Sequence, residues 1–273
     1  MLWQFSRLSR LHGDGWGTAW FDPEAPREPG QRTYRSPRPA HSNPVFAQQT
    51  GTEPSRARIV HLRWPSPGLR VRSENTHPFY ADAMSFAHNG SLMSPATVEQ
   101  LLEPESVASL VGATDSERYF ALVRQEFRRC GGDTVAAVAR SVRMLRALFP
   151  IASLNALMLS SDELVVVHAN SIKDAPTPEQ LPTGGCTPPD HLDAYYLMRW
   201  RFTADGTLAV ASSGLPDDGW APFPDNSITR VDLSDLSVTA VDGFEPVLDL
   251  RPNLTAATPD PAAPPRATPS RRQ

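Results

Sequence analysis

Residues 114–168 read TDSERYFALVRQEFRRCGGDTVAAVARSVRMLRALFPIASLNALMLSSDELVVVH, and the order of patterns in this stretch decides the fold class. Thr114 and Glu117 stand at capping-box spacing before a run with apolar residues at helical intervals. Asp133 precedes a second amphipathic run, so we expect two consecutive helices. After Pro150 the apolar period shortens to that of strands, which predicts a hairpin turning near residues 161–162.

Strand patterns also flank this stretch on both sides. Upstream, the glycine-rich HGDGWG leads into an apolar run through Phe21, and residues 58–63 alternate like a buried strand. Downstream, residues 195–211 and 228–241 each predict a further hairpin. Antiparallel strands with the helices grouped together are typical of an α+β fold, and the order differs from the βαβ alternation of nucleotide-binding folds.

Length and composition limit the number of domains, the class of partner and the location that we expect. The 273 residues suffice for one large domain or two small ones, and the net charge of −4 provides no basic field for nucleic acid. No apolar run approaches the length of a membrane span, and Cys130 and Cys186 are too few for a disulfide framework, so we expect a cytoplasmic protein. We expect one domain over residues 1–251 and a disordered Pro/Ala/Arg tail over residues 252–273.

Residues 61–90 hold three polar clusters beside predicted strands: HLRWPSPG, ENTHPF and FAHNG. Polar groups at strand ends are how a rigid sheet presents side chains to a small ligand. Taken alone, the Asn89-Gly90 pair favours a plain hairpin turn.

Seven motifs then occur in one order: HGDGWG, SNPVF, HLRW followed by Ser66, ENTHPF, FAHNG, GATDSE and LNALMLS. Together they resemble the class II glutamine amidotransferases, the N-terminal-nucleophile type, and in particular small stand-alone domains that act on γ-glutamyl amides. The resemblance runs from about His12 to about Val231. It implies a four-layer αββα sandwich in which two antiparallel sheets lie between helical layers.

The resemblance also implies how the ligand is held. Arg63 corresponds to the residue that binds the α-carboxylate, a role that suits a planar guanidinium. Asp115 corresponds to the partner of the α-ammonium. Ser66 stands where the family usually has Thr, and its hydroxyl can bond the carboxylate.

For the reaction itself, the resemblance assigns an oxyanion hole to the side-chain amide of Asn89 and the backbone N–H of Gly90. His77 matches a motif histidine whose expected role is to shape the pocket. Asp14 and Trp16 match the glycine-rich segment near the nucleophile.

Structural alternatives exist for individual residues. Arg63 can form an ion pair with Glu74, Asp115 can serve only as a helix N-cap, and His77 can be a hydrogen-bonded core histidine. The common order of the motifs favours the pocket role for Arg63, Asn89, Gly90 and Asp115. For His77 the core role remains the favoured one.

The family's nucleophile is a cysteine at residue 1 of the mature chain, with its own α-amine as base. Here Leu2 follows Met1, and only eleven residues precede His12, so we expect the first, nucleophile-bearing strand to be missing. Cys130 ends a predicted helix, where the dipole disfavours a thiolate, and Cys186 falls in the Pro/Gly-rich segment 172–192.

Three explanations compete for this absence: an upstream start that encodes Met-Cys, a truncation that has lost catalysis, and a pseudoenzyme that binds a ligand or partner. The completeness of the pocket motifs favours the first. We expect a form with an N-terminal Cys to hydrolyse a glutamine or γ-glutamyl amide through a thioester, and the 273-residue chain to be inactive as it stands.

The expected ligand is therefore a small glutamine or γ-glutamyl molecule, with neither nucleic acid nor membrane as partner. No cofactor is expected, and no metal, because the seven histidines show no ligand spacing. No synthetase domain follows residue 251, which indicates a stand-alone hydrolase or a separate synthetase or biosynthetic partner.

Overall fold

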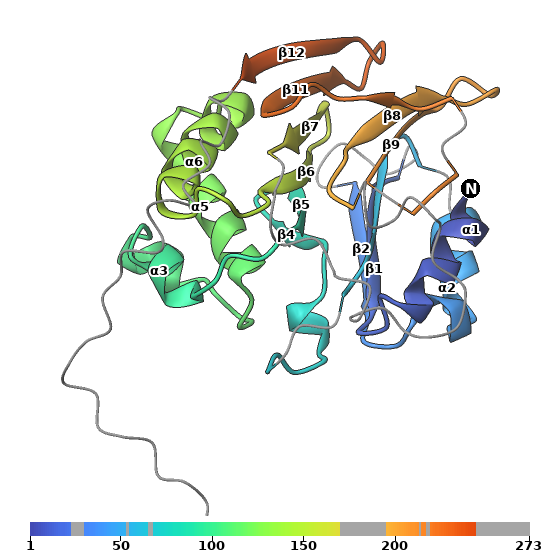
Figure 1. Ribbon diagram of the computed structural model, residues 1–273, viewed down its shortest axis with the longest axis horizontal. Coiled ribbons are helices and arrows are strands. Elements are labelled where there is room, and N and C mark those ends of the chain that lie inside the picture. The colour runs from blue at the N-terminus through green and yellow to red at the C-terminus, as the bar shows by residue number, and fades with distance from the viewer. Residues whose placement is uncertain are drawn as a thin grey trace, which may run out of the picture.

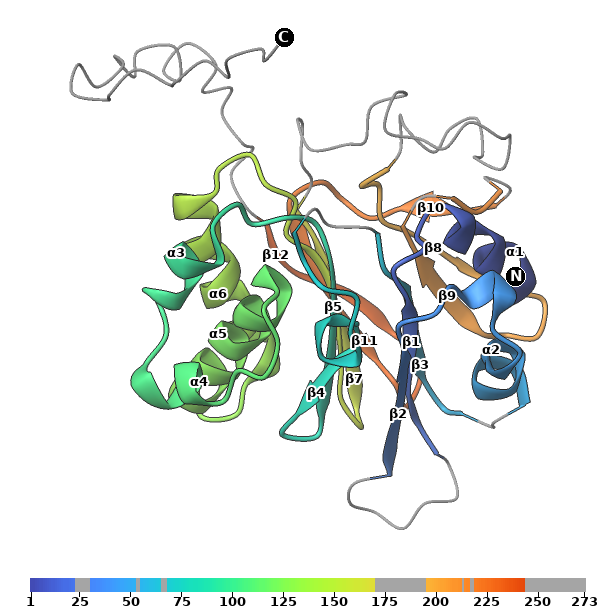
Figure 2. The same ribbon diagram turned by 90° about the horizontal axis from the view of Figure 1, so that it is seen from below.

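The structure is a computed structural model that describes residues 1–22, 30–52, 55–64, 68–169, 195–212, 214–216 and 219–243. Two β layers face each other, and helices cover both outer sides (Figures 1 and 2). The predicted α+β class and the four-layer αββα order are confirmed. The predicted absence of a first strand is not tested by the described residues and stays a prediction.

The first β layer is a six-stranded antiparallel sheet with the strand order β12-β11-β7-β6-β5-β4. Its strands are β4 (Phe79–Ala81), β5 (Met84–Asn89), β6 (Asn155–Leu159), β7 (Glu163–His168), β11 (Ser227–Asp232) and β12 (Val238–Gly243). The predicted hairpins of residues 154–168 and 228–241 are both confirmed as β6–β7 and β11–β12.

The second β layer consists of two three-stranded antiparallel sheets with the orders β2-β1-β3 and β10-β8-β9. Their strands are β1 (Trp16–Phe21), β2 (Gln31–Ser36), β3 (Arg58–Leu62), β8 (Arg199–Phe202), β9 (Leu208–Ala211) and β10 (Ala221–Pro222). All six residues of β1 are buried, because β1 is the central strand of its sheet and lies between the other layers.

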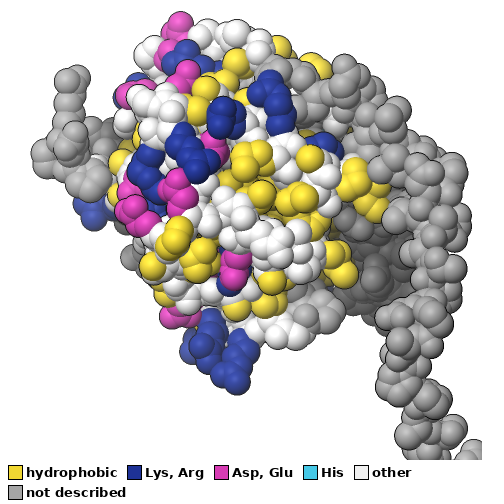
Figure 3. Space-filling view, turned by 90° about the vertical axis from the view of Figure 1, so that its left-hand side faces the viewer, with side chains coloured by type: hydrophobic (Ala, Val, Ile, Leu, Met, Phe, Trp, Pro, Cys, Tyr) yellow, Lys and Arg dark blue, Asp and Glu magenta, His cyan; other side chains and the backbone are white. Residues whose placement is uncertain are grey.

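The helices fall into two groups, one on each side. α3 (Pro95–Glu99), α4 (Pro104–Ala108), α5 (Asp115–Arg129) and α6 (Thr134–Leu148) cover the six-stranded sheet (Figure 2). On the far side lie α1 (Leu2–Arg7), α2 (Val45–Ala47) and short 3-10 and π turns. Thr114 and Asp133 are confirmed as N-caps, since their side chains accept from the backbone N–H of Glu117 and Ala136. Figure 3 shows the outer face of the first group, where hydrophobic side chains gather between arginine and acidic ones.

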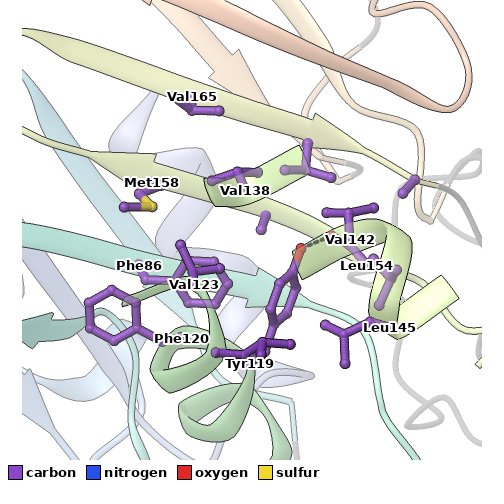
Figure 4. Close-up of a cluster of buried hydrophobic side chains, with 14 of the residues drawn as sticks. Phe86, Tyr119, Phe120, Val123, Val138, Val142, Leu145, Leu154, Met158 and Val165 are labelled. Carbon is purple, nitrogen blue, oxygen red and sulfur yellow. Dashed lines mark hydrogen bonds between the residues drawn. The ribbon is translucent and has the colours of Figure 1, made fainter. Parts of the chain in front are cut away.

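The main core lies between α5, α6 and the six-stranded sheet (Figure 4). Phe86 of β5 packs between Tyr119 and Phe120 of α5, with ring centroids 4.9 and 5.4 Å away. The Tyr119 hydroxyl donates to the carbonyl of Leu154 at 3.4 Å, which satisfies a polar group that would otherwise be costly to bury.

The turn between β4 and β5 lies before Asn89-Gly90 and not at it. The hairpin turn that the Asn89-Gly90 pair favours when taken alone does not occur there, because the β4–β5 hairpin turns at Asp82-Ala83, where both residues have positive φ (51° and 56°). The single domain of residues 1–251 stays a prediction. The tail of residues 252–273 and the segment 172–192 with Cys186 lie outside the described residues.

Candidate active site

The glycine-rich segment and the end of β3 lie side by side. The Arg63 N–H donates to the Gly15 carbonyl at 2.9 Å, and the Asp14 N–H donates to the Arg63 carbonyl at 3.3 Å. Gly15 has a φ of 120°, and a Cβ there would stand 2.5 Å from the Ser36 carbonyl oxygen. This position therefore requires glycine, and the turn fixes the backbone of Arg63.

The side chain of Arg63 is buried, with 4% of the residue exposed. One terminal nitrogen, Nη1, donates to the Arg70 carbonyl at 3.5 Å, and the other, Nη2, has no hydrogen-bond partner in the described part of the chain. Burial lowers the pKa of Arg63, and the charge of Asp14 raises it. The alternative of a structural ion pair with Glu74 is wrong, since Arg63 forms no ion pair among the described residues. A buried cation with an unsatisfied donor is suited to an anionic group.

Three histidines lie behind Arg63, at the interface of the two β layers. The rings of His61, from β3, and His77 are 4.2 Å apart, and His88 comes from β5. The segment before β4 passes so close to β1 that a Cβ on Gly17 would stand 2.1 Å from the His77 carbonyl oxygen. Both ring nitrogens of His77 lack a hydrogen-bond partner in the described residues, so its expected role as a hydrogen-bonded core histidine is wrong.

The pKa values of all three histidines are lowered. The pKa of His61 is lowered to about 4: burial is the largest cause, a hydrogen bond to the backbone of His88 opposes it, and the charges of His88 and Arg63 add to the lowering. For His77, burial and then the charges of His61, His88, Arg63 and Arg35 hold the pKa well below its usual range. Burial also lowers the pKa of His88, although Asp115 raises it. These rings are therefore neutral at pH 7 and ill suited to hold a proton there.

His88 links this cluster to the start of α5. Its Nδ1 lies 2.9 Å from the Ser116 hydroxyl, and its Nε2 lies 3.0 Å from the Ser153 carbonyl oxygen. Asp115 accepts from the Leu92 N–H at 2.5 Å and from the Ser116 N–H at 2.8 Å. The alternative in which Asp115 serves only as the N-cap is wrong, because Thr114 caps α5. Asp115 instead fixes the chain just beyond β5.

Asn89 and Gly90 end β5 beside Ser153. The Ser153 hydroxyl donates to the Asn89 carbonyl at 2.7 Å, whereas no hydrogen bond of the Asn89 side-chain amide occurs among the described residues. A Cβ on Gly90 would stand 2.1 Å from the Ser153 carbonyl oxygen and 2.6 Å from His88 Nε2. Only glycine fits this position, because the nearest atom belongs to the backbone.

Replacing Gly90 by alanine is expected to destabilise the protein by about 2–3 kcal/mol, because the new methyl group forces the Ser153 backbone to move. Chemical denaturation measures the change. The matched control is Gly51→Ala, since a Cβ on Gly51 has nothing within 4 Å. Equal stability of the two variants would contradict the geometry.

The structure thus brings most of the sequence-predicted site residues around one histidine cluster. Arg63 is on one side of it, Asn89 and Gly90 follow His88, and Asp115 reaches His88 through Ser116. Ser66 lies outside the described residues. The sequence interpretation gave no role to His61 or His88, although both stand within the motifs HLRW and FAHNG.

The described residues also bear on cysteine chemistry, metal binding and membrane insertion. Cys130 is a free, half-buried cysteine at the C-cap of α5. Within the described residues, no group of three or more His, Cys, Asp or Glu side chains is placed to hold a metal ion. Among the helices described, none combines the length and apolar character needed to cross a membrane.

The sequence is similar to that of one protein family and to several of its members. A family model described as class-II glutamine amidotransferases matches residues 3–176. A protein named as a glutamine amidotransferase, YafJ of Escherichia coli K12, is 29% identical over 170 residues, 59% of this chain and 62% of that protein. The chain thus matches less than two thirds of the length of that relative. The γ-glutamyl-hercynylcysteine sulfoxide hydrolase of Mycobacterium tuberculosis H37Rv is 24% identical over 85% of this chain and 81% of its own length.

Solved structures show the same fold. A glutamine aminotransferase class-II domain protein from Silicibacter pomeroyi superposes with a TM-score of 0.59 at 20% identity, covering 84% of this chain and 92% of that chain. The allosteric regulatory enzyme of purine biosynthesis gives a TM-score of 0.59 at 17% identity, covering 89% of this chain and 46% of its own.

Proposed function

This chain belongs to the class II glutamine amidotransferases, and from that premise we propose that Arg63, Asn89, Gly90 and Asp115 bind glutamine or a small γ-glutamyl amide. The observation that carries the proposal is the buried guanidinium of Arg63, whose Nη2 has no partner among the described residues. A ligand α-carboxylate supplies the missing acceptor, and a guanidinium matches it in planar geometry. Asp115, which is half-buried, is the proposed partner of the α-ammonium.

The amide end of the ligand is proposed to lie at Asn89 and Gly90. The side-chain amide of Asn89 makes no hydrogen bond within the described residues, so its N–H groups are available to an oxygen. The close packing of Gly90 on Ser153 holds the backbone N–H of residue 90 in a fixed direction. Fixed neutral donors stabilise the negative charge that an amide oxygen gains under attack.

Hydrolysis is proposed to run through a thioester in a form of the protein that carries an N-terminal cysteine. The thiolate attacks the amide carbon, the oxyanion collapses, and the C–N bond breaks as the amine leaves with a proton. Water then cleaves the thioester, which releases the glutamyl carboxylate and restores the thiol. A separate synthetase or biosynthetic enzyme is the proposed user of the released amine.

The 273-residue chain itself is proposed to bind without turnover, because no cysteine of the described residues lies at the site. The described cysteine, Cys130, is at the far end of α5 from Asp115. Neither Cys130 nor Cys186 carries a free α-amine to serve as base.

The test compares residues 1–273 with a form extended to begin with cysteine. We expect calorimetry to show L-glutamine or γ-glutamyl amide binding by both, and amine release only by the extended form. A Cys→Ser change at that first residue is the matched control, which should keep binding and lose release. Turnover by residues 1–273 would contradict the role of the cysteine. Binding without turnover in the extended form would identify a non-catalytic binding protein.

A further inference from the structure

A cavity of about 140 Å³ lies where α5, β4 and β2 meet. In both ribbon views β4 lies between the helical layer and β2 (Figures 1 and 2). Arg35, Glu74, Phe79, Leu110, Phe120 and Arg124 are among its lining residues. None of the residues assigned to the glutamine site lines it, so this is a separate place on the molecule.

Two of the charged lining groups already have partners. Glu117 accepts from the backbone N–H of Val111 and of Gly112, both at 2.8 Å. Arg124 forms an ion pair with Asp82 at 2.8 Å. Glu117 and Arg124 therefore line the cavity, but their charges are already paired and attract a ligand only weakly.

The other two charged groups, Arg35 and Glu74, have no ion-pair partner among the described residues. Arg35 is half-buried, and its guanidinium makes one long hydrogen bond, of 3.4 Å, to the Thr76 carbonyl. Burial lowers the pKa of Arg35, whereas the charges of Glu74 and Glu117 raise it. Arg35 and Glu74 nevertheless form no ion pair in the described part of the chain, and the exposed Glu74 side chain has no hydrogen bond there.

The remaining lining is apolar, with Phe79, Leu110, Phe120 and Ala121 among its residues. An anion alone would meet the repulsion of Glu74, and a cation alone would meet that of Arg35. A ligand with both charges and an apolar body satisfies all three features of the cavity.

We propose that this cavity binds a free amino acid with an apolar side chain. The α-carboxylate pairs with Arg35, the α-ammonium pairs with Glu74, and the side chain lies on the apolar wall. The segment from Glu74 to His77 then connects the two sites, because Asn75 accepts from the Ala113 N–H at 2.9 Å, two residues before Asp115. An occupant of the cavity thus contacts the segment that supports the glutamine site.

The experiment titrates L-phenylalanine into isotope-labelled residues 1–273 and follows backbone amide signals by NMR. We expect shifts concentrated in residues 79–81, 109–111 and 117–124. Phenylacetate lacks the ammonium and phenethylamine lacks the carboxylate, so each is expected to bind at least about 10-fold more weakly than L-phenylalanine. Equal binding of the three, or no shift in these residues, would overturn the proposal.

Variants separate this site from the glutamine site. Arg35→Met and Glu74→Gln are each expected to weaken L-phenylalanine about 10-fold while L-glutamine still binds. Glu74 is exposed, so Glu74→Gln carries the test even if Arg35→Met does not fold. Arg32→Met is the matched control, because Arg32 is exposed on the opposite face of β2. Loss of L-phenylalanine binding in Arg63→Met with retention in Arg35→Met would place the amino acid in the glutamine site and refute the second one.

Discussion

Replacing Arg63 by methionine is expected to weaken L-glutamine binding about 100-fold, because the ligand carboxylate loses its buried cationic partner. Methionine fills most of the volume of the arginine stem, so the packing behind it is largely kept. Arg63→Lys keeps the charge and loses the planar fork, and we expect an intermediate loss of about 10-fold. Calorimetry on the folded variants, with circular dichroism as the check on folding, measures both losses.

Arg146→Met is the matched control for Arg63→Met. Arg146 is another arginine whose Nε and Nη2 have no partner among the described residues, but it lies on α6 and donates to the carbonyls of Pro150 and Ala152. We expect this change to alter stability and leave the glutamine affinity as it was. If Arg63→Met bound glutamine as tightly as the unmodified protein, the carboxylate would have to lie elsewhere.

The second large effect is a loss of stability in acid. The pKa of His61 falls to about 4 in the folded protein, against the usual value of 6.5, and the pKa of His77 is also lowered. Below pH 6.5 the unfolded chain binds protons that the folded chain excludes, so the free energy of unfolding decreases as the pH falls toward 4. His61 alone accounts for a loss of about 2 kcal/mol between pH 7.5 and pH 5. Chemical denaturation at a series of pH values measures it.

His77→Phe identifies the source of this acid sensitivity. The ring shape is kept beside Phe79, 4.7 Å away, but the titrating group is removed. Because one fewer proton is then taken up on unfolding, the slope of stability against pH between 6.5 and 4 should become shallower. An unchanged slope would mean that His77 does not contribute to the acid loss.

Most of the fold could be predicted from the sequence, because the deciding signals are local. The caps Thr114 and Asp133 mark helices that the structure confirms, and the hairpin turn at residues 161–162 joins strands that do pair. Taken alone, Asn89-Gly90 favours a hairpin turn that the structure does not have, because turn propensity reports only on neighbours in sequence. The strand before it pairs with β6, more than 60 residues onward, and a pairing of that kind leaves no local signal.

The identities of the site residues could be predicted from the sequence. The partners and the packing of those residues could not. Arg63 and Glu74 have opposite charges and lie close in sequence, yet they form no ion pair among the described residues, because the backbone of residues 14–15 fixes the position of Arg63. His61, His77 and His88 come from three separate segments. Only the contact between the two β layers brings them together, so their shared loss of basicity follows from tertiary packing.

The pairing of β7 with β11 has a consequence for synthesis on the ribosome. Residues 169–226 separate the two strands, and the β10-β8-β9 sheet is made from part of that interval. While this interval is translated, on the order of several seconds, the apolar edge of β7 at Val165–Val167 has no neighbour. An unpaired apolar strand edge is a template for association with other chains. Until Ser227 emerges, this edge of β7 is therefore open to association with other chains.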